Sequence, residues 1–235
     1  MTRQVKKPEI RKNEILNVAR KFFFQKGFDQ TSVQDIIDAL GIAKGTFYHY
    51  FRSKTDLLDK LTDRTTNEIY VSLKPIVESD MTATDKFNKI FKAASAVTMA
   101  NIDVFVVIIK VLFKDENTII REKMYRNTVK KTTPLYSTII KQGIAEGIFD
   151  VQSPEDVAEI LIQIGTNLDE TVCRLFLTER EDPDHLVRTM VNKIKIYQNA
   201  IERILAAPKG SIQFYIPGEY ENMVREFYKK LKEDV

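Results

Sequence analysis

Cysteine is nearly absent from this sequence of 235 residues, which contains a single one, Cys173. One cysteine excludes a disulfide framework within the chain, and this fits a reducing cytoplasm. Glycine (8 residues) and proline (7 residues) are also scarce. Because strands joined by tight turns usually need more of both, this scarcity favours helices.

The sequence also lacks a long apolar run. The longest, residues 104–113, is interrupted by Lys110 and is far shorter than the roughly 20 residues that a membrane helix needs. The first twelve residues are polar and basic, without the apolar centre of a signal peptide. We therefore expect a soluble, cytoplasmic protein without a membrane partner.

Few residues suggest catalysis or metal binding. The two histidines, His49 and His185, fall in different predicted domains, and Cys173 has no histidine near it in the sequence. There is no glycine-rich phosphate loop and no cysteine–histidine spacing typical of a metal site. Acid–base chemistry by carboxylates is not excluded, but no group of residues suggests it. We predict a protein without enzyme activity, cofactor or metal.

What the sequence does contain is an ordinary globular composition, 43% hydrophobic and 29% charged, with an uneven distribution of charge. Residues 1–60 hold twelve Lys or Arg and seven Asp or Glu, a balance of +5, whereas the remainder has a balance of −2. A basic N-terminal part suggests a polyanion-binding site, although a solvated surface would have the same composition. The basic residues at the start, which either reach DNA or form a solvated arm, are Arg3, Lys6, Lys7, Arg11 and Lys12.

Three short helices are predicted before residue 52. Pro8 can open the first, and Gly27 ends it. Ser32, followed three residues later by Asp35, is typical of a helix N-terminus. Gly41 separates this second helix from a third, expected over residues 43–51. The tight turn between the last two helices predicts a helix-turn-helix arrangement.

The rest of the chain is also predicted to be helical. A fourth helix is expected from Ser53 or Lys54 to about Leu73, ended by Pro75, and we place the domain boundary within it, dividing the chain into residues 1–55 and 56–235. Residues 104–113 predict a buried helix, with a strand as the alternative because many are β-branched. Further helices are expected over residues 117–146 (kinked or broken at Pro134), 154–178, 184–206 and about 220–231, the last after an extended segment at 211–216.

Residues 31–58 read TSVQDIIDALGIAKGTFYHYFRSKTDLL. This stretch resembles the DNA-binding motif of the TetR family of bacterial transcriptional regulators, and Ile15 to Phe28 resembles the family's first helix. The resemblance implies an all-α fold: an N-terminal three-helix helix-turn-helix DNA-binding domain plus a C-terminal helical ligand-binding and dimerisation domain. It also implies a homodimer that contacts double-stranded DNA at a palindromic operator.

A recognition helix buries an aromatic back face and exposes small and polar groups to DNA. Phe47, Tyr50 and Phe51 can form that back face. Thr46 can contact base edges, and Gly45 allows close approach to the groove. The expected DNA-binding residues are Lys44, Gly45, Thr46, Tyr48, His49, Lys54, Thr31 and Ser32. Taken singly, each has an ordinary structural alternative.

One position departs from the family pattern. The family often has Ser or Thr at the start of the recognition helix, where this chain has Ala43. Alanine cannot cap a helix, at a cost of roughly 1 kcal/mol relative to serine. It also offers no hydroxyl to a phosphate, so this contact is absent from our prediction.

For the C-terminal domain, the resemblance implies dimerisation through helices at about 154–178 and 184–206 and a pocket for a small-molecule effector. The apolar character of these helices favours a mostly hydrophobic ligand. Asn167, Asp169 and Glu170 can add polar contacts. The candidate pocket residues, each of which would otherwise be ordinary core, are Phe87, Phe91, Met99, Phe105, Tyr125, Asn167 and Cys173. We expect a ligand-released repressor; the alternatives are a transcriptional activator or a ligand-independent DNA-binding protein.

Overall fold

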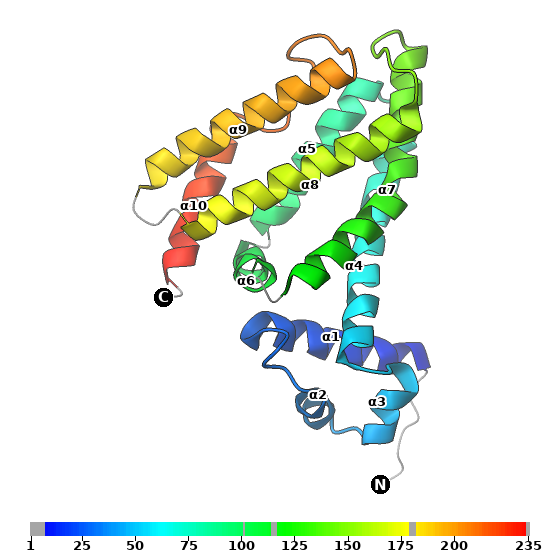
Figure 1. Cartoon of the computed structure of the whole chain (residues 1–235), viewed down its shortest axis with the longest axis vertical. Coiled ribbons are helices and arrows are strands. Elements are labelled where there is room, and N and C mark those ends of the chain that lie inside the picture. Colours follow the sequence, from blue (N-terminus) through cyan, green and yellow to red (C-terminus); the bar gives the residue numbers. More distant parts are fainter. Residues whose placement is uncertain (1–7, 101, 114–116, 179–181, 234–235) are drawn as a thin grey trace.

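The computed structural model describes residues 8–100, 102–113, 117–178 and 182–233. Across these ranges the regular structure is helical and no strand occurs, which confirms the predicted all-α fold (Figure 1). The α-helices are α1 (Pro8–Lys26), α2 (Val33–Leu40), α3 (Lys44–Tyr50), α4 (Lys54–Val77), α5 (Ala83–Ala100), α6 (Ile102–Leu112), α7 (Thr118–Ala145), α8 (Pro154–Thr178), α9 (Pro183–Ile204) and α10 (Glu219–Glu233). Among the described helices, none is long and apolar enough to cross a membrane.

Helices α1 to α3 and the first turns of α4 enclose a small core at the lower end of the molecule in Figure 1. The core forms because each helix buries one apolar stripe, including Ile15 of α1, Ile36 of α2 and Phe47 of α3, all fully buried. Leu57, Leu58 and Leu61 of α4 belong to the same core. The N-terminal unit is therefore attached to the rest of the protein through one continuous helix.

Helix α4 runs past Pro75 to Val77, so the predicted end near Leu73 was wrong. A proline removes one backbone hydrogen bond, because it has no N–H to donate to the carbonyl four residues earlier. Ile76 and Val77 are buried in the C-terminal core, and the Glu78 N–H donates to the Lys74 carbonyl at 3.0 Å. Burial of the two apolar side chains offsets the lost bond.

The C-terminal domain is a helical bundle in which α7 packs along both α4 and α8, and α9 packs along α8. Helix α7 is continuous through Pro134, so the predicted break there does not occur. Leu135, Ile139 and Ile140 directly after the proline are buried, and this burial holds the helix together. Residues 102–112 form helix α6 rather than the alternative strand.

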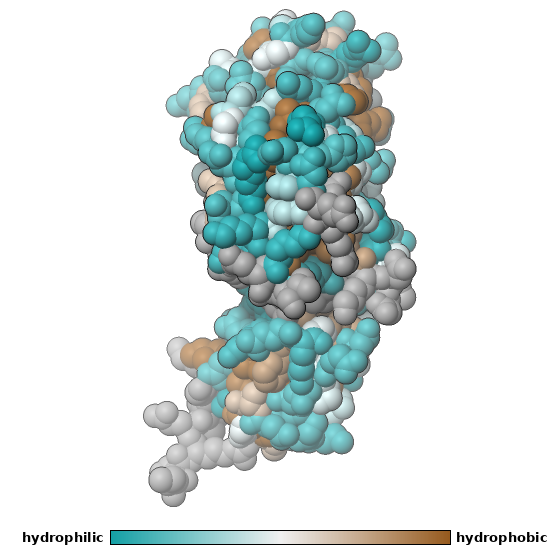
Figure 2. All heavy atoms as spheres, turned by 90° about the vertical axis from the view of Figure 1, so that its left-hand side faces the viewer, coloured by the Kyte–Doolittle hydropathy of each residue, from teal (hydrophilic) through white to brown (hydrophobic). Residues whose placement is uncertain are grey.

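The segment after α9 contributes to this core instead of leaving it. The irregular residues 205–218 and α10 place five large apolar side chains among the buried residues: Ile212, Phe214, Tyr220, Val224 and Phe227. The ring centroids of Phe91 and Phe214 lie 4.0 Å apart, and those of Phe176 and Phe227 lie 4.6 Å apart. Figure 2, which looks onto the side where α9 and α10 lie, shows a mostly hydrophilic surface over this packed interior.

Candidate DNA-binding and effector sites

Helix α2 begins with a capping box. The Ser32 hydroxyl accepts a hydrogen bond from the Asp35 N–H at 3.0 Å, and the Asp35 carboxylate accepts one from the Ser32 N–H at 2.7 Å. Lys26 of α1 lies 2.8 Å from the same carboxylate. The hydrogen bond from Lys26, followed by those from Ser32, lowers the pKa of Asp35 to about 2. These contacts fix α2 against α1 and so position the turn that follows.

The turn between α2 and α3 depends on Gly41, which has φ 58° and ψ 37°, a left-handed conformation that favours glycine. Its N–H donates to the Asp38 carbonyl at 3.1 Å. Ala43 then occupies the N-cap position of α3 with an extended backbone and no side-chain cap. The structure thus places at Ala43 the uncapped helix start that the sequence predicts.

Helix α3 has two distinct faces. Phe47 is fully buried, as is Phe51 at the C-cap, and Tyr50 is half-buried. The opposite face carries most of the predicted DNA contacts: Lys44, Gly45, Tyr48 and His49 are exposed, and Thr46 is half-buried. A Cβ built on Gly45 meets no heavy atom within 4 Å, so this part of the helix surface is open.

Three other predicted DNA-binding residues lie around this helix. Ser32 is exposed but serves as the cap of α2. Lys54 is half-buried, and its ammonium donates to the Phe28 and Asp29 carbonyls at 2.8 and 3.3 Å. Thr31 is a correction: it is fully buried and its hydroxyl donates to the Gly27 carbonyl at 2.7 Å, so it has no surface to offer DNA.

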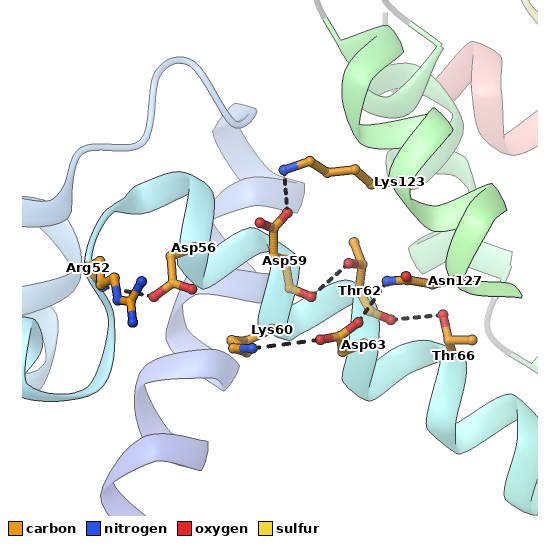
Figure 3. A network of polar contacts seen from close by, with 9 residues as sticks. All are labelled: Arg52, Asp56, Asp59, Lys60, Thr62, Asp63, Thr66, Lys123 and Asn127. Carbon is orange, nitrogen blue, oxygen red and sulfur yellow. Dashed lines mark hydrogen bonds and ion pairs between the residues drawn. The ribbon is translucent and has the colours of Figure 1, made fainter. Parts of the chain in front are cut away.

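Arg52 is a further candidate that the sequence reasoning did not include. It directly follows α3 and its side chain is exposed, while its backbone N–H donates to the Asp56 carboxylate at 2.8 Å (Figure 3). A basic side chain next to the exposed face of α3 suits a phosphate contact. Its position directly after the motif is the signal that could have identified it. Within the basic arm, Arg3, Lys6 and Lys7 lie outside the described residues, whereas Arg11 pairs with Glu14 in α1 at 2.8 Å.

Four predicted effector residues lie on or beside the C-terminal core. Phe87 is buried, and Phe91, Phe105 and Cys173 are half-buried and pack against it. Burial, together with the charges of Asp169 and Glu170, raises the pKa of the Cys173 thiol to about 12. A thiol that stays protonated in this way behaves as a small apolar group.

The other three predicted effector residues lie elsewhere. Asn167 is on the outer side of α8, where it accepts a hydrogen bond from the Tyr197 hydroxyl of α9 and lines a groove between these two helices rather than the C-terminal core. Met99 is exposed. Tyr125 is half-buried on α7, and burial, with the charges of Glu159 and Glu122, raises its pKa. Sequence position alone did not distinguish the inner from the outer faces of these helices.

The outer sides of α8 and α9 form an apolar groove. Ile160 and Ile196 leave 44% and 57% of their surface exposed, far more than is usual for isoleucine. The groove is lined by Ile160, Gln163, Ile164, Asn167, Ile196, Tyr197 and Ala200. Both helices are those predicted for dimerisation.

Polar pairs connect α4 to α7 at three successive helical turns, and Figure 3 shows the first two. Lys123 lies 2.7 Å from Asp59, and Asn127 donates to Asp63 at 2.7 Å. One turn further along, Lys131 donates to Asn67 at 3.1 Å. We call these three pairs the α4–α7 ladder. It joins the helix that carries the DNA-binding unit to the centre of the C-terminal bundle.

Comparison with known proteins agrees with this geometry. Residues 15–61 match the family described as bacterial regulatory proteins, tetR family, and residues 108–190 match the tetracyclin repressor-like C-terminal domain. The HTH-type transcriptional repressor KstR2 of Mycobacterium tuberculosis is 27% identical over 144 residues, which cover 59% of this chain and 69% of the relative. The fatty acid metabolism regulator protein of Bacillus subtilis is 21% identical over 168 residues, covering 72% and 84%.

Solved structures share the fold. A TetR-family transcriptional regulator from Pectobacterium atrosepticum superposes with a TM-score of 0.64 at 16% identity, covering 86% of this chain and 97% of that one. The chain therefore belongs to the TetR family of bacterial transcriptional regulators, and it is a regulator rather than an enzyme.

Proposed function

We propose that this protein is a dimeric repressor that binds a palindromic operator through α3 and is released by a small, mostly hydrophobic effector. The observation that carries the proposal is the division of α3 into a buried aromatic face and an open face with Lys44, Gly45 and Tyr48. The relative named above as a repressor, KstR2, supports the direction of control. The operator, the effector and the released state are parts of the proposal.

The groove on α8 and α9 supports the dimer. Exposed isoleucines on two adjacent helices give a surface that a second copy can cover, since a homodimer interface is more apolar than an average surface. A single short recognition helix buries too little surface to specify a site. Two recognition helices about 34–36 Å apart, one from each protomer, would contact successive major grooves.

Release follows from linkage between two states of the dimer. In one state the spacing of the two DNA-binding units matches the operator, and in the other it does not. An effector that binds the second state more tightly lowers the affinity for the operator, and DNA lowers the affinity for the effector by the same factor. The α4–α7 ladder and the continuous helix α4 supply a rigid connection between the two domains.

The test is an electrophoretic mobility assay with DNA flanking the protein's own gene at several salt concentrations. We expect one dimer to bind a palindromic site, with an affinity that falls steeply as the salt concentration rises. The Thr46→Ala/Tyr48→Ala variant should not bind this site. Lys92→Ala, which removes an exposed charge from α5, is the control and should bind as the parent does. Equal binding of all DNA by every variant would contradict the proposal.

Oligomeric state is tested separately by light scattering. Ile160→Glu/Ile196→Glu should yield a folded monomer, because it places four charges in the groove of a dimer. Val71→Glu introduces the same charge at an apolar residue of α4 that is 58% exposed, and should leave the dimer intact. A dimer that survives the double substitution would place the interface elsewhere.

A further inference from the structure

Asp169 occupies an unusual place on α8. Residues seven apart on a helix lie on the same face. Asp169 lies seven residues after Ile162 and seven before Phe176; both are buried, and Phe176 belongs to the C-terminal core. The carboxylate is therefore at the centre of the inward face of α8, opposite the groove that carries Ile160.

The space in front of this carboxylate is not filled by protein. Although it lies on the inward face, Asp169 is one of the exposed residues of α8. Gly165, one turn earlier on the same face, points to the same space: a Cβ built there meets no heavy atom within 4 Å. Two adjacent positions on the inner face of α8 thus border an opening in the core.

Two tyrosines from other helices lie near the carboxylate. The charge of Asp169 adds to burial in raising the pKa of Tyr136 of α7 and of Tyr220 of α10. Tyr136 packs against Phe87, with ring centroids 5.8 Å apart, and Tyr220 packs against Tyr215 at 5.6 Å. Two uncharged rings from other helices, and the Cys173 thiol of α8, therefore lie near the carboxylate.

Asp169 has no partner within the part of the chain that the structure describes: no hydrogen bond and no ion pair reaches its carboxylate. Desolvation by the surrounding protein raises its pKa to about 6. Its neighbour Glu170 differs, since it pairs with Arg174 at 2.8 Å. An unpaired carboxylate inside a domain costs free energy, and a bound cation would remove that cost.

We propose that this opening binds an apolar molecule bearing one protonated amine, with Asp169 as the anchor of the amine. An ammonium group would form a charge-assisted hydrogen bond with the carboxylate, and the tyrosine rings would add cation–π attraction. The same carboxylate repels a ligand that carries a carboxylate or phosphate at this position. The inference rests on the proposed function in that it assigns the effector to this site.

The probes are decylamine, 1-decanol and decanoate, which share a chain and differ in the charge of the head group. Calorimetric titration of the full-length protein at pH 7.5 should give decylamine a Kd about tenfold or more below that of decanol, and decanoate the weakest binding. Asp169→Asn should abolish the preference for the amine and leave decanol unchanged. Glu170→Gln is the matched control on the same helix and should behave as the parent does.

Equal binding of the three compounds would overturn the proposal, as would tight amine binding by Asp169→Asn. Asp169→Ser, with circular dichroism to verify folding, provides a second variant. Operator binding by the same preparations distinguishes the two proposals. If the protein binds its operator but none of the decyl compounds, the amine site fails and the repressor stands. If decylamine binds through Asp169 without lowering operator affinity, the site stands and release by this effector fails.

Discussion

Asn127 of α7 donates a hydrogen bond over 2.7 Å to Asp63 of α4, which is 64 residues earlier in the chain. The pair is the middle rung of the α4–α7 ladder, with Lys123–Asp59 on one side and Lys131–Asn67 on the other. Figure 3 shows the first two rungs along the N-terminal half of α4. Since α4 enters the DNA-binding core through Leu57 and Leu61, a shift of α7 along this ladder would move the DNA-binding unit.

The ladder should be measurable as coupling between its residues. Asp63→Ala and Asn127→Ala should each lower the free energy of unfolding by about 1 kcal/mol, because each leaves a part-buried polar group without its partner. The double variant should lose less free energy of unfolding than the two single variants lose together, by about 0.5 kcal/mol or more. Urea unfolding of the four proteins measures this cycle. Strict additivity would show that the pair does not contribute, and Lys74→Ala, from an exposed pair with Glu78, is the control.

Substitution of two adjacent residues of α3 should affect different properties, stability in one case and operator affinity in the other. Phe47 is fully buried, so Phe47→Ala should lower the free energy of unfolding by about 3–5 kcal/mol. Tyr48 is 47% exposed, so Tyr48→Ala should leave stability within about 0.5 kcal/mol of the parent and lower operator affinity. Thermal unfolding and the mobility assay together separate these effects. Loss of stability in Tyr48→Ala would assign that tyrosine to packing.

The uncapped start of α3 offers a stabilising substitution. Ala43 has the extended backbone of an N-cap, with φ −71° and ψ 147°, so Ala43→Ser should accept a hydrogen bond from the first turn and add about 1 kcal/mol. Ser32→Ala, which removes the cap of α2, should cost about the same amount. Both are read from denaturant midpoints. No gain in Ala43→Ser would mean that the serine hydroxyl turns away from the helix.

The pH dependence of stability should report on Asp169. Its pKa is raised to about 6 from the ordinary 3.8, so the folded state holds this proton more tightly than the unfolded state does. The resulting stabilisation is complete below about pH 4 and is lost as pH rises through about 6. Asp169→Asn should therefore melt progressively higher than the parent between pH 4 and 7, with a constant difference above that range. Tyr136, Tyr220 and Cys173, which face this carboxylate, stay neutral throughout because their pKa values are raised.

A difference in melting temperature that does not change with pH would contradict this assignment. Glu155→Gln is a control for which the stability relative to the parent should change with pH in the opposite direction. Its hydrogen bond with Lys141 lowers the pKa of Glu155, so that variant should lose stability relative to the parent as pH rises from 3 through 5.

The DNA-binding unit could be predicted from the sequence because its signals are local. The Ser32–Asp35 capping box, the left-handed Gly41 and the buried Phe47 each depend on residues within one or two turns. Thr31 is the exception in this region. A threonine next to a helix start reads as polar surface, and only the return of its hydroxyl to the Gly27 carbonyl shows that it is buried.

Two prolines that were expected to interrupt helices, Pro75 and Pro134, lie inside continuous helices. An interior proline costs about 3 kcal/mol, whereas each buried isoleucine or valine contributes about 1.5–3 kcal/mol. Two such residues after Pro75, and three large apolar residues after Pro134, therefore outweigh the penalty. This balance depends on tertiary contacts, which is why the sequence pattern alone placed the helix end and the break wrongly.

The proposed effector site was the least predictable part, because it depends on which face of α8 points inward. Asn167 and Asp169 are two residues apart, and this spacing puts them on opposite sides of a helix. Asn167 lies in the outer groove, while Asp169 lies at the centre of the buried face. The α4–α7 ladder was equally hidden, because its partners are 64 residues apart.

The burial of Phe227 and Val224 in the C-terminal core has a consequence for synthesis on the ribosome. All the buried residues of the DNA-binding core have emerged once Leu61 is made, with only Leu112 and Met124 still to pack against them, so this core can fold early in translation. The C-terminal bundle lacks part of its interior until α10 has been made. During the synthesis of residues 62–218 a nascent chain can therefore carry a folded DNA-binding unit beside a C-terminal bundle that α10 has yet to complete.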